Sequence, residues 1–456
     1  MKATANPDKE PAADSQLPSP VLTATSDRDP LSYRIGEPMR FTFRAIGAPP
    51  GASIHWTLTG DDGRHATGEL PCAPTQGCAP AVQTAGGCAP TQGCAPAVQT
   101  TQGCAPAVQT TQGCAPAVQT AGLPRPGFVR LRADIVAKDG AELAHFEGGA
   151  GADVDAIRAD TPLPPDFDAF WARRKAELAA IPMDGAQCRE IPSCLGGVRL
   201  FEVSIPCAGG RPSTGFLSIP DRPGRFPGRI HFHGYDESWR DSAYATPQPD
   251  RLLRDEILLD LSAHGFELNR EPEYYAALRA ESGSNGHDYA FDPIQNSDPR
   301  AAYFGGMSWR VMRGLEYLKS RPEWDGETLV AEGGSCGGLQ TIWAAALDHD
   351  VTECRPFIPW CCNLAGSAKG REHGDWFIQW VPALAYYDPV NMARLIPATC
   401  RTTVTWAGLG DYICPPSGVM AFYNSLRRPK SITFIQGAMH LYMPPEPRQT
   451  AMRSAQ

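Results

Sequence analysis

Several features are missing from this 456-residue sequence, and each absence excludes a class of function. No stretch reaches the roughly 18 consecutive apolar residues that a bilayer span requires, because charges, Pro or Gly interrupt every hydrophobic run. No block of basic residues is present, and 41 Lys and Arg against 50 Asp and Glu leave a net charge of −9. A membrane-spanning protein and a nucleic-acid partner are therefore not expected.

The chain also begins without the apolar core of a signal peptide, and its Pro/Ala/Asp-rich start predicts a disordered leader over residues 1–30. This pattern does not identify the cellular compartment of the protein. The length and the 42% hydrophobic content are ordinary for a globular protein of two or three domains.

A short repeat interrupts the first part of the chain. The motif QGCAPAVQT occurs at 76–84, 92–100, 102–110 and 112–120. Each copy has too few apolar side chains to offset the entropy of ordering its backbone, so 72–120 is predicted to be a mostly disordered insert. The alternative is a soft-metal site on the recurring cysteines, but the C-x-x-C pairs of metal sites are missing. The cysteines in question are Cys78, Cys88, Cys94, Cys104 and Cys114.

The segments around the repeat predict a small Ig-like β-sandwich over 31–155. Apolar and polar residues alternate at 39–47, 53–60 and 128–140, and Pro/Gly turns separate these runs. Such a module ahead of a larger domain serves either as an accessory unit or as a structural spacer.

A different pattern begins at residue 156 and predicts an α/β catalytic domain over 156–456. After Asp166, a suitable N-cap, one face of a helix carries Phe167, Phe170 and Trp171. Strands then alternate with helices, which predicts a mostly parallel sheet flanked by helices, with its chemistry at the carboxyl ends of the strands. The expected strands are 198–206, 213–220, 229–235, 256–261, 327–335, 401–411 and 431–440, with a helix near 308–320.

Residues 333–338, GGSCGG, form the G-x-S-x-G pattern of a nucleophile elbow between an apolar strand and a helix-like run. This context points to Ser335 as a nucleophile. Among the later histidines only His440 ends a strand, and among the later aspartates only Asp411 directly follows an apolar strand. Ser335, Asp411 and His440 are therefore the predicted catalytic triad, in the chain order that this fold uses.

Two backbone amides are expected to stabilise the oxyanion, one from Cys336 and one from Tyr235 or a neighbour in the HFHGY loop. His231 and His233 of the same segment could hold zinc, but no third ligand stands nearby in the sequence, so no metal site is predicted. Trp376 and Trp380 are candidates for the sugar side of a substrate pocket, or equally for core packing.

At this point the residues resemble the acetyl xylan esterase and cephalosporin C deacetylase family, carbohydrate esterase family seven. The resemblance covers roughly residues 160–445 and rests on PPDFDAFW, HFHGYDES, GGSCGG, GLGDYICPPSGVMAFYN and PKSITFIQGAMH. It implies an α/β-hydrolase that removes acetyl groups from sugars, with the same triad and the Tyr235 and Cys336 amides as oxyanion donors. It implies no cofactor, and it allows an oligomer.

Two positions depart from the family pattern. Cys336 stands where Gln is usual, and Leu441 stands where an acidic residue or Gly is usual. Two rival functions stay open: an α/β-hydrolase for another ester (glucuronoyl, feruloyl or lactone), and a non-catalytic carbohydrate-binding protein. A polysaccharide substrate would favour export.

Overall fold

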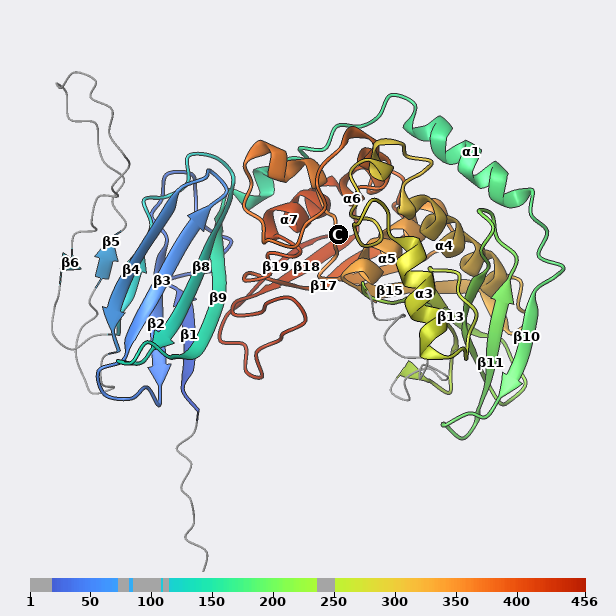
Figure 1. The fold of residues 1–456 in the computed structure, drawn as a ribbon, viewed down its shortest axis with the longest axis horizontal. Helices are drawn as coiled ribbons and strands as arrows, with labels where there is room; N and C mark the ends of the chain where they lie inside the picture. Colours follow the sequence, from blue (N-terminus) through green and yellow to red (C-terminus); the bar gives the residue numbers. More distant parts are fainter. Residues whose placement is uncertain (1–18, 73–81, 85–107, 110–114, 236–250) are drawn as a thin grey trace, which may run out of the picture.

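The computed structural model describes residues 19–72, 82–84, 108–109, 115–235 and 251–456. Figure 1 shows a β-sandwich beside a larger α/β unit, with strands β17 to β19 of the large sheet nearest the sandwich. In the described part of the chain, no helix is both long and apolar enough to cross a membrane.

The sandwich consists of two sheets, with strand orders β1-β2-β7-β5-β6 and β4-β3-β8-β9. Alternate residues of β2, β3 and β8 point inward, and Phe41, Ile54 and Leu131 are fully buried between the sheets. The predicted alternation is thus the pattern of an actual sandwich core. Its strands are β1 Val21–Ser26, β2 Arg40–Ile46, β3 Ser53–Gly60, β4 His65–Pro71, β5 Val82–Thr84, β6 Val108–Gln109, β7 Ala117–Gln119, β8 Gly127–Val136 and β9 Glu142–Ala152.

Two segments predicted to be disordered contribute strands to this sandwich, which corrects the prediction there. β1 lies inside the expected leader and pairs antiparallel with β2, burying Leu22 and Ala24. β5, β6 and β7 come from three of the repeat copies; β7 pairs with β5 and with β2, burying Val118. Pairing with β2 supplies the apolar contacts that neither segment has on its own. The five repeat cysteines proposed as metal ligands lie outside the described residues.

The larger unit is built on a ten-stranded sheet of order β10-β11-β12-β14-β13-β15-β16-β17-β18-β19. The contiguous run from β14 through β13 to β18 is parallel, whereas the strands at both ends pair antiparallel. The sheet is therefore mostly parallel at its centre, as predicted. Its strands are β10 Gln187–Ile191, β11 Val198–Ile205, β12 Ser213–Pro220, β13 Phe226–Phe232, β14 Ile257–Ser262, β15 Trp324–Gly334, β16 Glu353–Phe357, β17 Arg401–Gly408, β18 Lys430–Ile435 and β19 Thr450–Ala455.

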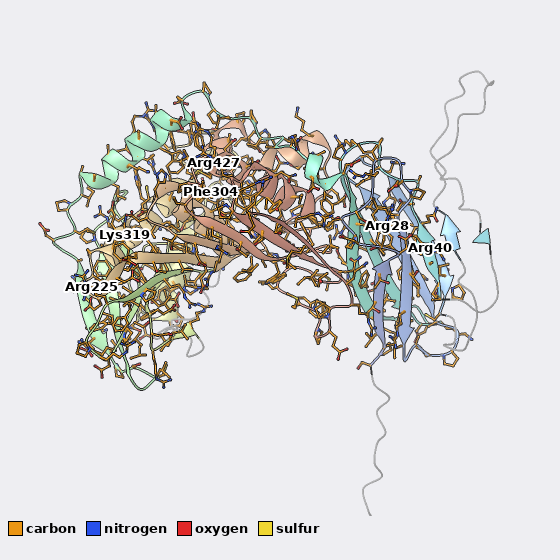
Figure 2. All side chains as sticks on the ribbon, turned by 180° about the vertical axis from the view of Figure 1, so that it is seen from behind. Arg28, Arg40, Arg225, Phe304, Lys319 and Arg427 are labelled. Carbon is orange, nitrogen blue, oxygen red and sulfur yellow. The ribbon has the colours of Figure 1, made fainter. Side chains whose placement is uncertain are left out.

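Helices pack on this sheet and enclose its core. The central helix α5 contacts β13, β15 and β16, while α4 lies beside it over β12 to β15. Figure 2 shows Phe304 of α4 inside this layer and Arg225 and Lys319 toward its outer part. The arrangement is the α/β-hydrolase fold that the sequence predicts. The helices are α1 Phe167–Ala179, α3 Pro272–Ser282, α4 Tyr303–Lys319, α5 Cys336–Leu347, α6 Pro389–Met392 and α7 Pro416–Ser425.

Helix α1 differs from the prediction in one detail. Phe167, Phe170 and Trp171 are buried on one face, as expected. Asp166 stands at the N-cap position, but its side chain accepts no capping hydrogen bond from a backbone amide of the helix. Its carboxylate instead accepts from the Tyr386 hydroxyl and lies 3.4 Å from Arg173. The Asp166 side chain therefore makes tertiary contacts in place of the expected N-cap hydrogen bond.

A buried carboxylate, Asp388, holds the chain after β16 in place. Its two oxygens accept hydrogen bonds from the amides of Asn363, Leu364 and Val390 and from the Thr161 hydroxyl, at 2.6 to 3.0 Å. Burial nonetheless raises the pKa of Asp388 to about 6, although these four donors favour the charged form.

This raised pKa predicts a pH-dependent stability. Between about pH 4 and 6 the folded protein binds a proton at Asp388 that the unfolded chain releases, so the free energy of unfolding falls as the pH rises. The contribution of this group is about 3 kcal/mol, from a shift of about two units. Urea unfolding at several pH values should show this contribution as a stability difference between the wild type and Asp388→Asn that falls between about pH 4 and 6. Parallel curves for the two proteins would contradict the assignment.

Candidate active site

Ser335 lies in a sharp turn between β15 and α5. Its backbone angles, φ 55° and ψ −119°, are strained for a residue with a side chain. The turn is held on both sides, because the Ser335 amide donates to the Phe357 carbonyl at 3.1 Å and its carbonyl accepts from the Trp360 amide at 3.0 Å. The strand-turn-helix context predicted for the elbow is present.

The glycines around Ser335 allow this turn to approach the neighbouring strand. A Cβ on Gly337 would lie 2.2 Å from the Phe232 carbonyl oxygen, and one on Gly333 would lie 2.6 Å from the same atom. Backbone atoms of β13 cannot move aside easily, so a side chain at either position would push the elbow away. The G-x-S-x-G spacing here reflects this close packing.

His440 lies beside the serine at the end of a turn that follows β18. Its Nε2 is 3.1 Å from the Ser335 Oγ. Met439 and Tyr442 exchange two backbone hydrogen bonds of 3.0 Å across the turn, and Leu441 adopts a positive φ of 58°. Glycine would adopt this conformation without the steric penalty that a leucine side chain incurs.

Asp411 completes the cluster from the loop after β17. Its Oδ2 lies 3.1 Å from His440 Nδ1, while its Oδ1 accepts from the amides of Ile413 and Cys414 at 3.1 and 2.9 Å. The carboxylate is 1% exposed, so these bonds fix its orientation. The three predicted side chains thus form one hydrogen-bonded chain, although 105 residues separate Ser335 from His440 and 29 separate His440 from Asp411.

The two predicted oxyanion donors come from the start of α5 and from the loop after β13. Cys336 is the first residue of α5, where helix amides point toward the turn. Tyr235 follows β13, and its hydroxyl donates to the Tyr289 carbonyl at 2.9 Å, which anchors the loop. The end of β13 contacts α5 directly, since Gln340 Nε2 donates to the His233 carbonyl at 3.2 Å.

An aromatic cluster borders the Tyr235 loop. The Trp376 ring lies 4.9 Å from the rings of Tyr235 and Phe291 and 5.1 Å from that of Trp360. Trp376 is 36% exposed, so part of its face meets solvent. Trp380 instead packs against the main hydrophobic core. Sequence reasoning missed Phe291 and Trp360, because only the tertiary fold brings their segments to Trp376.

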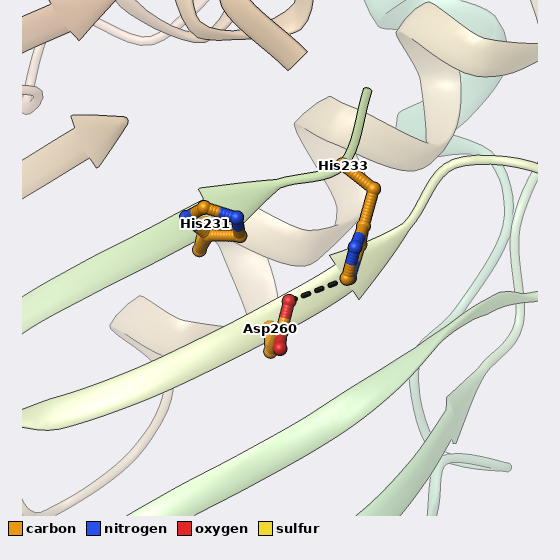
Figure 3. Close-up of side chains that lie close together, drawn as sticks. All are labelled: His231, His233 and Asp260. Atoms are coloured by element: carbon orange, nitrogen blue, oxygen red, sulfur yellow. Dashed lines mark ion pairs between the residues drawn. The ribbon is translucent and has the colours of Figure 1, made fainter. Parts of the chain in front are cut away.

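The H-x-H pair has a third neighbour that the sequence analysis did not identify. Asp260 of β14 is in register with His231 across the parallel β13–β14 pair, and the ligand atoms of Asp260, His231 and His233 lie within 4.8 Å of one another (Figure 3). The expectation that no third ligand lies nearby was wrong, because neighbouring strands bring together residues about 30 positions apart.

The geometry of this group favours an ion pair over a metal. His233 Nε2 lies 2.7 Å from Asp260 Oδ1, a hydrogen-bond distance, whereas two tetrahedral zinc ligands are about 3.4 Å apart. Arg251 lies 3.4 Å from the other carboxylate oxygen. The His233 and Arg251 side chains hold the pKa of Asp260 low in spite of its burial. Asp411, Cys414 and His440 form a second such group, but there the Asp411 oxygens already accept the hydrogen bonds described above.

The rival candidates for base and acid lie elsewhere. His373 Nδ1 lies 2.7 Å from the Gly374 carbonyl, and its ring packs on Phe377. His349 and Asp375 are exposed. The arrangement at Ser335 is the one that can transfer a proton from a hydroxyl to an imidazole supported by a carboxylate.

Comparisons with known proteins agree with this chemistry. A family model described as acetyl xylan esterase (AXE1) matches residues 152–246 and 371–455, which include Tyr235, Asp411 and His440. Among curated proteins, acetyl esterase Axe7A of Xylanibacter ruminicola is 27% identical over 325 residues, covering 68% of this chain and 69% of that protein.

Two solved structures share the fold. An acetyl xylan esterase from Paenibacillus sp. R4 superposes with a TM-score of 0.53 at 26% identity, over 64% of this chain and 94% of that one. Acetyl xylan esterase 1 from Thermoanaerobacterium sp. JW/SL YS485 gives 0.52 at 20% identity, over 64% and 93%. At that identity it is evidence for the fold alone. Taken together, the family model, the curated relative and the Paenibacillus structure mean that the chain is a carboxylic ester hydrolase similar to the acetyl xylan esterases.

Proposed function

We propose that this protein removes acetyl groups from acetylated sugars, such as xylo-oligosaccharides and cephalosporin C, through an acetyl-enzyme on Ser335. The observation that carries the proposal is the hydrogen-bonded chain from Ser335 Oγ through His440 to Asp411, with both bonds at 3.1 Å. The acetyl esterase relatives support acetate as the acyl group. The mechanism needs no cofactor.

Each side chain has one role in the two-step reaction. His440 Nε2 takes the proton of Ser335 as Oγ attacks the acetyl carbonyl, and Asp411 holds the imidazole with its Nδ1 proton toward Oδ2. The amides of Cys336 and Tyr235 stabilise the oxyanion. His440 then protonates the departing sugar oxygen, and a water molecule deprotonated by the same imidazole hydrolyses the acetyl-enzyme, releasing acetate.

We assign Trp376 to the sugar side of the pocket, because its partly exposed ring lies in the aromatic cluster beside Tyr235. Trp376→Ala should raise KM for acetylated xylo-oligosaccharides about fivefold to tenfold, since an aromatic face contributes about 1 to 1.5 kcal/mol. KM for 4-nitrophenyl acetate, which has no sugar, should change little. Trp380→Ala tests the second candidate. Unchanged KM values for the sugar esters in both variants would remove the tryptophans from the binding site.

Two other functions are tested by the same assay. A glucuronoyl, feruloyl or lactone ester would use the same triad, because pocket shape selects the acyl group. A non-catalytic carbohydrate-binding protein would use the sandwich and would have no use for the hydrogen-bonded triad.

The test is acetate release measured side by side from acetylated xylo-oligosaccharides and cephalosporin C, with ferulate release from a feruloyl ester and Ser335→Ala as the control. Acetate from the first two substrates alone is the expected result. Activity on the feruloyl ester alone would favour the rival esterase. Inactivity on all three substrates, with 4-nitrophenyl acetate also untouched, would favour the binding protein.

A further inference from the structure

We propose that the β-sandwich positions the two loops that carry Asp411 and His440. Strand β9 of the sandwich contacts both loops and holds them in place. This inference rests on the proposed triad. It concerns residues outside that triad, which touch neither the serine nor the substrate.

The first contact joins β9 to the histidine loop. Gln436 lies four residues before His440 and is 3% exposed. Its Oε1 accepts from the Gly149 amide and its Nε2 donates to the Gly149 carbonyl, both at 2.9 Å. β9 is the edge strand of its sheet. The Gln436 side-chain amide therefore makes the pair of hydrogen bonds to β9 that a further strand would make.

The second contact joins β9 to the aspartate loop. A Cβ on Gly410, the residue before Asp411, would lie 2.5 Å from the Glu147 carbonyl oxygen of β9. Likewise, a Cβ on Gly148 would lie 2.2 Å from Gln436 Oε1. Gly410 therefore lets the aspartate loop touch the backbone of β9, and Gly148 leaves space for the Gln436 side chain against the same strand.

A third set of contacts joins the sandwich to Tyr412, the residue after Asp411, and to the segment before Trp376. Arg130 of β8 donates to Glu147 at 2.8 and 3.0 Å, and its guanidinium stacks over the buried Tyr412 ring at 4.3 Å. The Tyr412 carbonyl accepts from the Gly374 amide at 2.7 Å, and the preceding Glu372 amide donates to Asp61 of the sandwich at 2.9 Å.

These contacts converge on the two loops that position the base and the acid. A serine hydrolase loses rate steeply when its hydrogen-bonded groups move by a fraction of an ångström, because alignment supplies much of the catalysis. The same interface would serve stability alone if the contacts were spread evenly along it. Other contacts, such as those of Ser26 and Leu31 with Gln449 and Arg453, lie further from the triad, whereas Gln436 and Gly410 contact β9 within four residues of His440 and Asp411. This placement points to a positioning role for Gln436.

The chain offers a matched pair of variants at this interface. Gln449 also joins the two units, accepting from the Ser26 amide at 3.0 Å and donating to the Arg28 carbonyl at 2.8 Å, but it lies nine residues beyond His440. Gln436→Ala and Gln449→Ala each remove a similar set of hydrogen bonds. Only the first removes hydrogen bonds between β9 and the segment that leads to His440. Gln449 shares one backbone hydrogen bond with Gln436, from the Gln436 amide to the Gln449 carbonyl at 3.0 Å, and this bond does not involve the side chain that Gln449→Ala removes.

The experiment compares both variants with the wild type in the full chain, well below their unfolding temperatures. We expect Gln436→Ala to lower kcat for 4-nitrophenyl acetate at least tenfold with KM nearly unchanged, and to slow fluorophosphonate labelling of Ser335 in parallel. Gln449→Ala should keep both rates within twofold. Gly410→Ala should reproduce the first result, whereas Gly196→Ala, whose new Cβ meets nothing within 4 Å, should not.

Two outcomes would overturn the proposal: unchanged rates in folded Gln436→Ala and Gly410→Ala, or equal losses in the Gln436 and Gln449 variants that follow their loss of stability. Failure of the triad itself is distinguishable, because Ser335→Ala would then retain activity whatever the sandwich does.

Discussion

Ser335→Ala is expected to lower kcat/KM for 4-nitrophenyl acetate by about a millionfold, the scale of loss on removing a triad nucleophile. The variant lacks the oxygen that attacks the carbonyl, while Ala fits the same space, so the free energy of unfolding should stay within about 0.5 kcal/mol. Steady-state hydrolysis and urea unfolding together check this. As a matched control, Ser193→Ala in the loop between β10 and β11 should keep full activity. A loss below about tenfold in Ser335→Ala would mean that another group attacks the ester.

The strained turn at this residue allows a companion measurement. With φ at 55° and ψ at −119°, Ser335 has a backbone conformation that glycine adopts without penalty. Ser335→Gly should therefore unfold with a free energy about 1 kcal/mol higher than Ser335→Ala, although both are inactive. Greater stability in an inactive variant would show that the elbow holds its strain for catalysis. Equal stability in the two variants would mean that the turn is relaxed.

Asp411→Asn is expected to lower kcat by about three to four orders of magnitude, with KM within a few fold. The amides of Ile413 and Cys414 donate to Oδ1, so the asparagine oxygen would take that side and its NH2 group would face His440. The imidazole would then carry its proton on Nε2, where it cannot accept the proton of Ser335. Kinetics on 4-nitrophenyl acetate measure the loss.

The control for this variant is Asp375→Asn, because Asp375 is an exposed aspartate in the same part of the sequence. It should keep kcat within about twofold, as expected for a solvated side chain. If Asp375→Asn lost activity and Asp411→Asn retained it, the acid of the triad would have been assigned to the wrong residue.

Local patterns predicted much of the fold because they depend on neighbouring residues. The alternation in β2, β3 and β8, the apolar face of α1 and the elbow at Ser335 all lie where the sequence placed them. The strands β1 and β7 were missed, because they are stable only through pairing with β2. Asp166 was misassigned for a similar reason, since a distant tyrosine takes its carboxylate.

The sequence alone determined the residues of the proposed triad and their order. A nucleophile elbow and two strand ends are local features that a sequence shows, and the predicted fold brings the carboxyl ends of those strands together. Only the tertiary structure decided which other residues surround the site. Strand register brings Asp260 to His233, folding brings Trp360 and Phe291 to Trp376, and β9 reaches Gln436 across 287 residues. Such contacts depend on how whole layers pack, and no spacing along the chain records that packing.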